Sequence, residues 1–189
     1  MPEISLKARP ALDRYRRQFS ETELVEVTDK ALVSIAIPQG DADKLQKAMA
    51  AAYGTTFPVP GSSTLSADGA ARFLGLQPDQ CFAMFEFEGN KAIRAVAGAL
   101  DDKCYCTDQS DSWAILRLSG TLALTALERI CPLDLTPTEF PPGNVARTVM
   151  EHLGVIILCE DKNRYVLMSP RSSALSFLHA IETSLENVL

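Results

Sequence analysis

Apolar and polar positions alternate along the first half of the chain in a way that predicts strands around one amphipathic helix. Residues 24–27 and 32–37 are rich in β-branched side chains, which is typical of strands. After Asp41, apolar side chains recur every three or four positions until Gly54, which predicts a helix with these residues at its ends. Two apolar runs around the polar turn 77–80 predict a hairpin.

A second helix and a closing strand complete this half. Asn90 is expected to cap a helix in which Ile93, Val96 and Leu100 share one face, and residues 104–107 form an apolar run suited to a strand.

The second half repeats the order of the first. It predicts a strand at 113–118, a helix at 121–131 capped by Thr121, and a long apolar strand at 147–159. A polar turn then leads to a strand at 164–168, and a final helix begins near Ser172.

Residues 74–84 and 157–167 match in their order of strand, polar turn and strand, 83 positions apart. The repeat predicts an α+β fold of two ferredoxin-like units with antiparallel sheets and helices packed on one face. The expected division is an extended N-terminal arm at 1–22, a first αβ unit at 23–108 and a second at 109–189.

Composition and charge narrow the class of protein. A net charge of −6 argues against nucleic-acid binding, and no apolar run is long enough to span a membrane. Five cysteines, an odd number, indicate reduced thiols in a cytoplasmic protein. The N-terminal arm is nevertheless basic, through residues that include Arg14, Arg16 and Arg17. It is either a solvated arm or one that docks on an acidic surface, its own or a partner's.

Candidate chemistry is sparse. Cys104 and Cys106 would share one face of a strand, but a zinc site usually needs four ligands, so small apolar side chains on a buried face are the favoured interpretation. His152 is expected within the long strand beside Met150 and Ile156, as a core or interface residue rather than a base.

Other reactive side chains also lack a catalytic context. Cys131 is expected in the last turn of a helix, where the helix dipole disfavours a thiolate, and His179 lies on the flank of the last helix. No glycine-rich phosphate loop is present. We therefore expect no catalytic, cofactor-binding or metal-binding residues in this chain, which favours a subunit or a binding module.

The segment from residue 105 to the C-terminus resembles the gamma subunit of heterotetrameric sarcosine oxidase, a family related to the folate-binding aminomethyltransferase fold. The resemblance depends on motifs in the family's order: Thr107-Asp108-Gln109-Ser110, Trp113-Ala114-Ile115-Leu116-Arg117-Leu118-Ser119-Gly120, Cys131-Pro132-Leu133-Asp134-Leu135, Phe140-Pro141-Pro142-Gly143, Arg147-Thr148 and Pro170-Arg171-Ser172. The combination of the Cys-Pro-Leu-Asp-Leu and Phe-Pro-Pro-Gly motifs is its most specific part.

The resemblance implies a two-unit, aminomethyltransferase-like fold and a non-catalytic role beside alpha, beta and delta subunits. The complex would demethylate sarcosine oxidatively to glycine, pass the one-carbon unit to tetrahydrofolate and produce hydrogen peroxide. FAD, FMN, NAD and tetrahydrofolate would then lie in the partner subunits, and none in this chain.

Two segments are candidate contacts with the partner subunits that the resemblance implies. One is the basic arm with Arg14, Arg16 and Arg17. The other is the loop Phe140, Pro141, Pro142 and Gly143, which the two prolines stiffen. Phe140 is either an exposed anchor for a partner or a plug in the chain's own core.

Three other functions stay open. The chain could serve a related secondary-amine oxidase, or it could be a scaffold without a ligand. It could also be a stand-alone folate-binding protein, for which Asp108 and Asp134 are candidate carboxylates by residue type alone.

Overall fold

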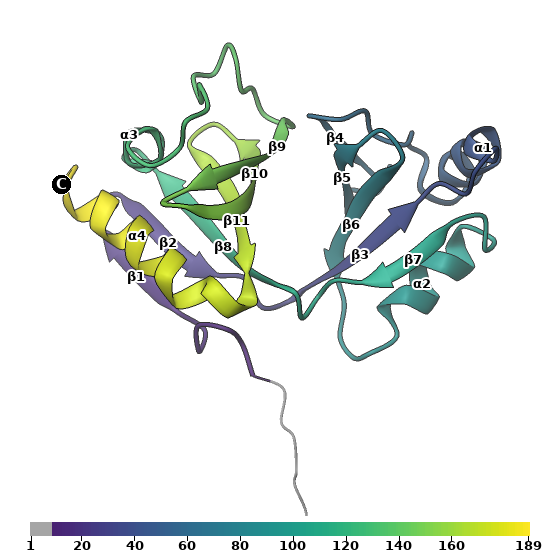
Figure 1. Cartoon of the computed structure of the whole chain (residues 1–189), viewed down its shortest axis with the longest axis horizontal. Coiled ribbons are helices and arrows are strands. Elements are labelled where there is room, and N and C mark those ends of the chain that lie inside the picture. Colours follow the sequence, from purple (N-terminus) through teal and green to yellow (C-terminus); the bar gives the residue numbers. More distant parts are fainter. Residues whose placement is uncertain (1–8) are drawn as a thin grey trace, which may run out of the picture.

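The computed structural model describes residues 9–189 as two antiparallel sheets side by side, each with its helices on the outer side (Figure 1). The expected α+β class with two antiparallel sheets is confirmed. The first eight residues of the expected N-terminal arm lie outside the described residues.

The five-stranded sheet belongs to the N-terminal half. Its strands, in spatial order, are β4 (Ser63–Leu65), β5 (Ala71–Gln77), β6 (Gln80–Glu86), β3 (Lys30–Ala36) and β7 (Tyr105–Asp108). Helices α1 (Ala42–Tyr53) and α2 (Ala92–Ala99) cover its outer face. The predicted helix at 41–54 is confirmed, with Gly54 in the left-handed conformation at its C-cap.

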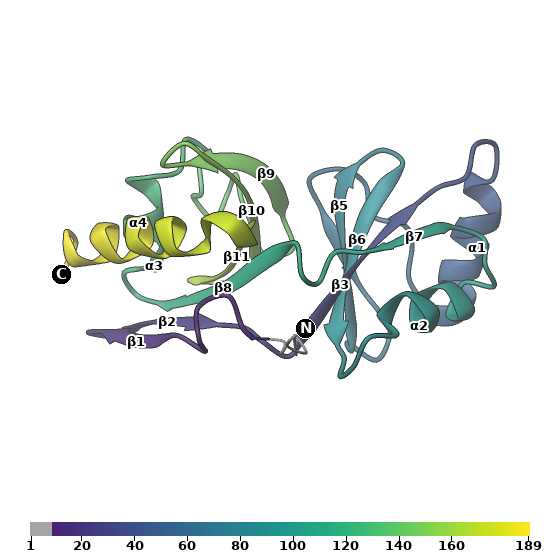
Figure 2. The same ribbon diagram turned by 60° about the horizontal axis from the view of Figure 1, so that its bottom comes forward.

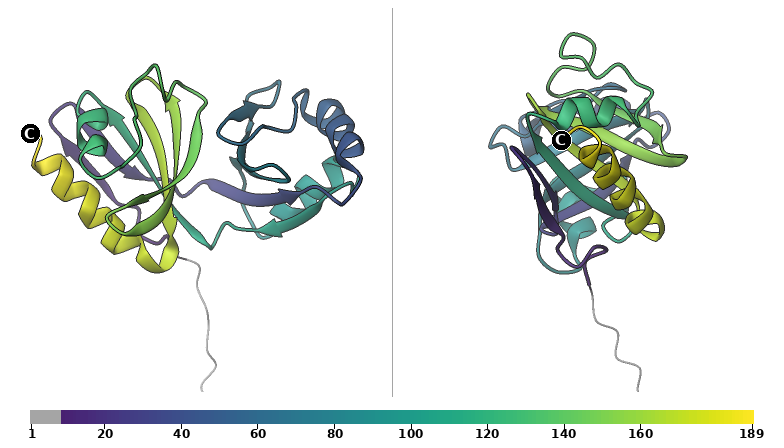
Figure 3. Two further views of the ribbon diagram at one scale, coloured as in Figure 1. Left: turned by 45° about the horizontal axis from the view of Figure 1, so that its top comes forward. Right: turned by 90° about the vertical axis from the view of Figure 1, so that its left-hand side faces the viewer.

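The six-stranded sheet contains the C-terminal half and the first two strands of the chain. Its spatial order is β1 (Arg16–Phe19), β2 (Thr22–Glu26), β8 (Trp113–Gly120), β11 (Arg164–Pro170), β10 (Leu153–Asp161) and β9 (Val145–Met150). Helix α3 (Ala123–Glu128), the short 3₁₀ helix η1 (Arg171–Ser173) and helix α4 (Ala174–Glu186) complete this half. Helix α4 lies along the outer face of the sheet (Figure 3).

The two sheets repeat one topology. In both, a central strand (β3 or β8) pairs with the last strand of a three-strand meander on one side and with a closing strand (β7 or β2) on the other. The chain therefore crosses between the sheets twice, from β2 to β3 and from β7 to β8 (Figure 2). This repeat in strand order supports the division of the chain into two αβ units.

The position of β1 and β2 differs from the sequence expectation. Residues 16–19 form a strand rather than part of an extended arm, and residues 22–26 pair with β8 of the second unit instead of the first. The pattern of 24–27 predicts a strand, but the partner of this strand is about a hundred positions away in the sequence. Local periodicity carries no information on such a pairing.

The expected long strand at 147–159 is wrong, because it is two strands, β9 and β10, joined at Glu151 and His152. Both turn residues have positive φ, 46° and 69°, as tight two-residue hairpin turns require. Asn and Gly usually mark such turns, so the Glu-His pair gave no signal. His152 is consequently exposed in the turn rather than placed beside Met150 and Ile156.

Three groups of buried apolar side chains hold the molecule together. One lies between α3, α4 and the six-stranded sheet, and one between α1, α2 and the five-stranded sheet. The third contains no helix residues and lies between the inner faces of the two sheets, with Leu32 and Phe82 from one sheet and Ile156 and Met168 from the other. The two units are therefore joined by a shared apolar core as well as by the two segments that cross between the sheets.

Candidate assembly surface and the junction between the sheets

The loop Phe140–Gly143 faces inward at its first residue. The side chain of Phe140 is 7% exposed and packs in the core beneath α3 and α4. Its backbone N–H donates to the carbonyl of Thr136 at 2.8 Å. Of the two alternatives for Phe140, the structure shows the plug in the chain's own core, and Pro142 is left as the exposed residue of the loop.

The end of the same loop ties the two sheets together. The carbonyl oxygen of Gly143 accepts hydrogen bonds from the backbone N–H and the hydroxyl of Ser63, both at 2.8 Å. The N–H of Val145 donates to the carbonyl of Gly61 at 3.1 Å, and Arg72 donates to the Ser63 hydroxyl at 3.0 Å. The loop therefore bridges β4 of one unit and β9 of the other.

Arg17 docks β1 on the chain's own helix α4. Its guanidinium lies 3.0 Å from a carboxylate oxygen of Glu182 and 2.8 Å from one of Glu186, and it also lies over the ring of Phe19. The hydroxyl of Tyr15 donates to Glu182 at 2.6 Å. Burial and this bond raise the pKa of Tyr15. Of the two alternatives for the basic arm, Arg17 therefore docks on an acidic surface of its own chain, helix α4.

Arg14 and Arg16 remain directed to the surface. Arg16 makes one ion pair, at 3.3 Å to Glu23, with 69% of its side chain exposed. Arg14 has a positive φ of 60° in a turn organised by Glu26. The buried carboxylate of Glu26 accepts the backbone N–H groups of Leu12 at 2.9 Å and Arg14 at 2.7 Å.

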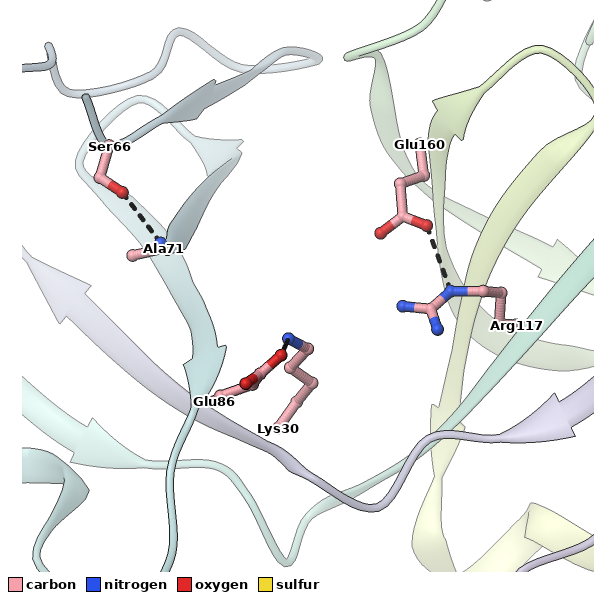
Figure 4. A network of polar contacts seen from close by, with 6 residues as sticks. All are labelled: Lys30, Ser66, Ala71, Glu86, Arg117 and Glu160. Atoms are coloured by element: carbon pink, nitrogen blue, oxygen red, sulfur yellow. Dashed lines mark hydrogen bonds and ion pairs between the residues drawn. The ribbon is translucent and has the colours of Figure 1, made fainter. Parts of the chain in front are cut away.

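The inner faces of the sheets carry polar side chains opposite one another. Lys30 pairs with Glu86 on one wall, at 2.9 Å, and Arg117 pairs with Glu160 on the other, at 3.2 Å (Figure 4). Each pair stays within its own sheet.

Arg147 joins the two walls. It projects from β9 with its guanidinium carbon 5.7 Å from the ring centroid of Phe82 and 5.9 Å from that of Trp113. Phe82 lies in the five-stranded sheet, and Trp113 begins β8, directly after the second crossing between the sheets. Sequence reasoning missed this cluster, although the single tryptophan of the chain marks it.

A cavity of about 350 Å³ opens where the chain crosses between the sheets. Its lining includes Arg14, Lys30, Trp113 and Arg171. The lining combines cationic side chains with the acidic side chains of Glu26 and Asp111. Lys30 already has Glu86 as a partner.

The remaining candidates lie apart from these surfaces. Cys131 follows the end of α3, which stops at Glu128 rather than at 131, and burial raises the pKa of its thiol. His179 on α4 lines a separate shallow cavity. Within residues 9–189, no group of three or more His, Cys, Asp or Glu side chains is placed to hold a metal ion. The helices of this part of the chain include none long and apolar enough to cross a membrane.

The two carboxylates considered for folate are not brought together. Asp108 ends β7 and accepts the N–H of Ser110 at 2.9 Å, whereas Asp134 accepts the N–H and the hydroxyl of Thr136 at 2.9 and 2.7 Å. Both are exposed and occupied by local turns. Neither lines the cavity at the crossing.

The two-sheet αβ fold is shared with an aminomethyltransferase and with a chain of a sarcosine oxidase. Aminomethyltransferase T of the glycine cleavage system from Bartonella henselae matches over 85% of this chain and 45% of its own, with a TM-score of 0.62 and 13% identity. A chain of the heterotetrameric sarcosine oxidase from Corynebacterium sp. U-96 matches over 95% of both chains, with a TM-score of 0.80 and 20% identity. No family model matches the sequence.

Sequence comparison then leads to a particular subunit. The gamma subunit of sarcosine oxidase from Corynebacterium sp. (strain P-1) is 30% identical over 127 residues, and that from an Arthrobacter species is 29% identical over 110 residues. The aligned parts cover 67% and 58% of this chain but only 62% and 54% of the two relatives. The resemblance to sarcosine oxidase gamma subunits that the motifs indicated is confirmed, and the chain is a homologue of these subunits.

Proposed function

We propose that this chain is the gamma subunit of a heterotetrameric sarcosine oxidase. In that complex it packs against the catalytic subunits and supplies no active-site residue of its own. The observation that carries the proposal is its similarity, at 30% identity, to a protein named as this subunit. The match over 95% of a chain in a heterotetrameric sarcosine oxidase supports it at the level of the fold.

The reaction follows from the same proposal. The complex oxidises sarcosine to glycine with dioxygen, passes the one-carbon unit to tetrahydrofolate and releases hydrogen peroxide. Alpha, beta and delta subunits bind FAD, FMN, NAD and tetrahydrofolate. The complex is cytoplasmic, a location that the five free thiols of this chain support.

Affinity purification from the chain's own cells tests the proposal. A tagged copy is expected to recover larger partner proteins, visible flavin absorption and sarcosine-dependent production of peroxide. The separately purified chain is expected to be colourless and inactive. Recovery of the chain without flavoproteins, or flavin bound to the isolated chain, would contradict the proposal. A panel of other N-methyl amino acids in the same assay decides between sarcosine and a related secondary amine.

We further propose Arg14, Arg16 and Pro142 as partner contacts, since these expected interface residues are exposed and, unlike Arg17, do not pair with α4. The double variant Arg14→Ala/Arg16→Ala should recover several-fold less flavoprotein at physiological salt, because exposed charges mainly guide association. Arg164→Ala is the matched control, an exposed arginine on another strand. Equal recovery with both variants would remove the basic segment from the interface.

Folate binding by the isolated chain is the alternative that the aminomethyltransferase-like fold keeps open. Titration of the purified chain with tetrahydrofolate is expected to give no heat and no change in Trp113 fluorescence. Saturable binding that is lost in Asp108→Asn or Asp134→Asn would instead support the stand-alone folate-binding protein.

A further inference from the structure

Two thiols meet at the uncovered edge of the five-stranded sheet. The sulfur atoms of Cys104 and Cys106 lie 3.4 Å apart, because residues two apart on an extended chain project to the same side. Cys106 belongs to β7, which is the end strand of its sheet, and Cys104 directly precedes that strand. Both side chains pack against the core beneath α1 and α2 but remain partly exposed, unlike the other three cysteines.

The other three cysteines differ from this pair. Cys81, Cys131 and Cys159 are buried, and their burial raises the pKa of each thiol. Such thiols react slowly with oxidants because the thiolate is the reactive form.

Within the pair, the two sulfurs have unequal roles. The hydrogen bond between the two sulfurs lowers the pKa of the Cys106 thiol and raises the pKa of Cys104. Burial and nearby Asp102 both act against a thiolate on Cys106, each with a smaller effect than the hydrogen bond. Cys106 is therefore the better nucleophile, and Cys104 is placed to react with it in a second step.

We propose that Cys104 and Cys106 are a peroxide-reactive dithiol that closes to a reversible disulfide. The Cys106 thiolate attacks one oxygen of hydrogen peroxide, the O–O bond breaks, and a sulfenic acid and one water result after proton transfer. The Cys104 sulfur then displaces the hydroxyl group from Cys106, which forms the S–S bond and releases a second water. In total, two thiols lose two hydrogen atoms and one peroxide is reduced to two waters.

The strand geometry makes this disulfide possible but labile. Two steps along a strand span about 6.6 Å between Cα atoms. This separation is near the upper end of the Cα range that disulfides bridge, and the Cβ atoms must also approach to about 3.5–4.5 Å. Closure therefore bends the backbone at Cys104–Cys106, and a disulfide strained in this way is readily reduced by other thiols. Strand β7 pairs with β3 over only four residue pairs and also packs against α2, so closure needs a local adjustment at these contacts.

This inference does not depend on the proposed function, because the oxidant can be added to the purified chain. If the proposed function holds, the partner subunits release the same oxidant within the complex.

Peptide mapping of the full chain tests the dithiol. The reduced protein is treated with hydrogen peroxide, quenched, alkylated with N-ethylmaleimide in denaturant and digested with trypsin. Cleavage after Lys103 and Arg117 gives a peptide, 104–117, with both cysteines and no other. This peptide is expected to become unalkylated and two hydrogen atoms lighter while Cys131 and Cys159 are still fully alkylated. Dithiothreitol before alkylation should restore both labels.

Variants separate the two roles and the outcomes. Cys104→Ser should stop at a Cys106 sulfenic acid that dimedone traps, whereas the control Cys131→Ser should leave the cross-link in 104–117 unchanged. Cys106→Ser should also abolish the cross-link in 104–117. Circular dichroism checks that each variant is folded. The proposal is overturned if the wild-type peptide stays doubly alkylated at peroxide doses that oxidise the buried cysteines, or if it gains oxygen without an internal disulfide.

Discussion

At the scale of single residues, Gly120 shows how one backbone position permits the junction of β2, β8 and α3. Its φ is +136°, and a Cβ atom there would lie 2.2 Å from the carbonyl oxygen of Glu21 and 2.4 Å from the Cα of Thr22. The close approach also lets the buried hydroxyl of Thr22 accept the N–H of Leu122 at 2.9 Å, just before α3 begins. A residue without a side chain is therefore needed where strand and helix meet.

Gly120→Ala should destabilise the chain by roughly 2–4 kcal/mol, because the added methyl group meets backbone atoms that cannot move aside. Gly154→Ala is the matched control. Gly154 lies in β10, where an added methyl group would have no other atom within 4 Å, so its free energy of unfolding should change by less than about 1 kcal/mol. Urea denaturation of both variants measures the difference, and equal losses would contradict this account of Gly120.

Tyr165 gives a pH dependence with a defined sign. Burial raises the pKa of its hydroxyl from 10.0 to about 12. The folded chain therefore keeps this proton when the unfolded chain has lost it, so the stability contribution is complete below pH 10.0 and is lost as pH rises toward about 12.

Tyr165→Phe should leave the melting temperature at neutral pH nearly unchanged and reduce its fall between pH 10 and 12. Thermal melts of both proteins across this range, with ultraviolet titration of tyrosine ionisation, provide the measurement. Parallel melting curves for the two proteins would assign the alkaline loss to other groups.

At the scale of elements, β1 is held by side-chain contacts to α4 as well as by its strand pairing. It pairs with β2 over four residues, and its outer edge is free in the part of the chain that the structure describes. Glu182 on α4 accepts from both Tyr15 and Arg17, with 21% of its side chain exposed, whereas Glu186 meets Arg17 alone and is half exposed. Glu182 therefore carries most of this contact.

Glu182→Ala should cost about 1 kcal/mol and speed hydrogen exchange of the β1 amides, since it removes two hydrogen bonds at once. Glu186→Ala, one turn further along the same helix, should cost less than about 0.5 kcal/mol because its pair is exposed and screened. Exchange mass spectrometry on the two variants reports on β1 directly. Identical exchange of β1 in both would show that strand pairing alone holds this element.

At the scale of the whole molecule, the relative position of the two sheets depends on a few contacts beyond the shared core. The Ser63–Gly143 bonds tie the ends of β4 and β9, and Arg147 from one sheet meets Phe82 of the other. Trp113 stands between them, 6.3 Å from the Phe82 ring in an edge-to-face arrangement. Any change in the position of one sheet relative to the other should therefore alter the environment of Trp113.

Arg147→Ala should weaken the chain by roughly 0.5–1 kcal/mol, as expected for a cation–π contact at the surface. It should also shift the emission of Trp113 and increase its quenching by iodide. The control Arg164→Ala removes an exposed arginine from the same sheet and should change neither property. Unchanged Trp113 fluorescence in Arg147→Ala would show that Arg147 does not shape the junction.

Local pattern predicted most of the elements. The helix at 41–54, the hairpin at 72–85 and the repeat of one topology all follow from short-range periodicity and turn residues, and the structure has them in these places. The turn at Glu151 and His152 was missed because neither residue type marks positive φ. The loop at Phe140 was ambiguous, since the same stiff aromatic segment suits a partner's pocket or the chain's own core.

Pairing and burial were decided only by the tertiary structure. Side-chain alternation along a strand shows which face is apolar, but it does not show which distant strand lies beside it. The sequence therefore did not show that β2 pairs with β8, that Arg17 pairs with α4, or that Gly143 accepts a hydrogen bond from Ser63. All three contacts join segments far apart in the sequence. The sequence alone established two αβ units with the motifs of an oxidase subunit, while packing decided which of the expected interface residues remain at the surface.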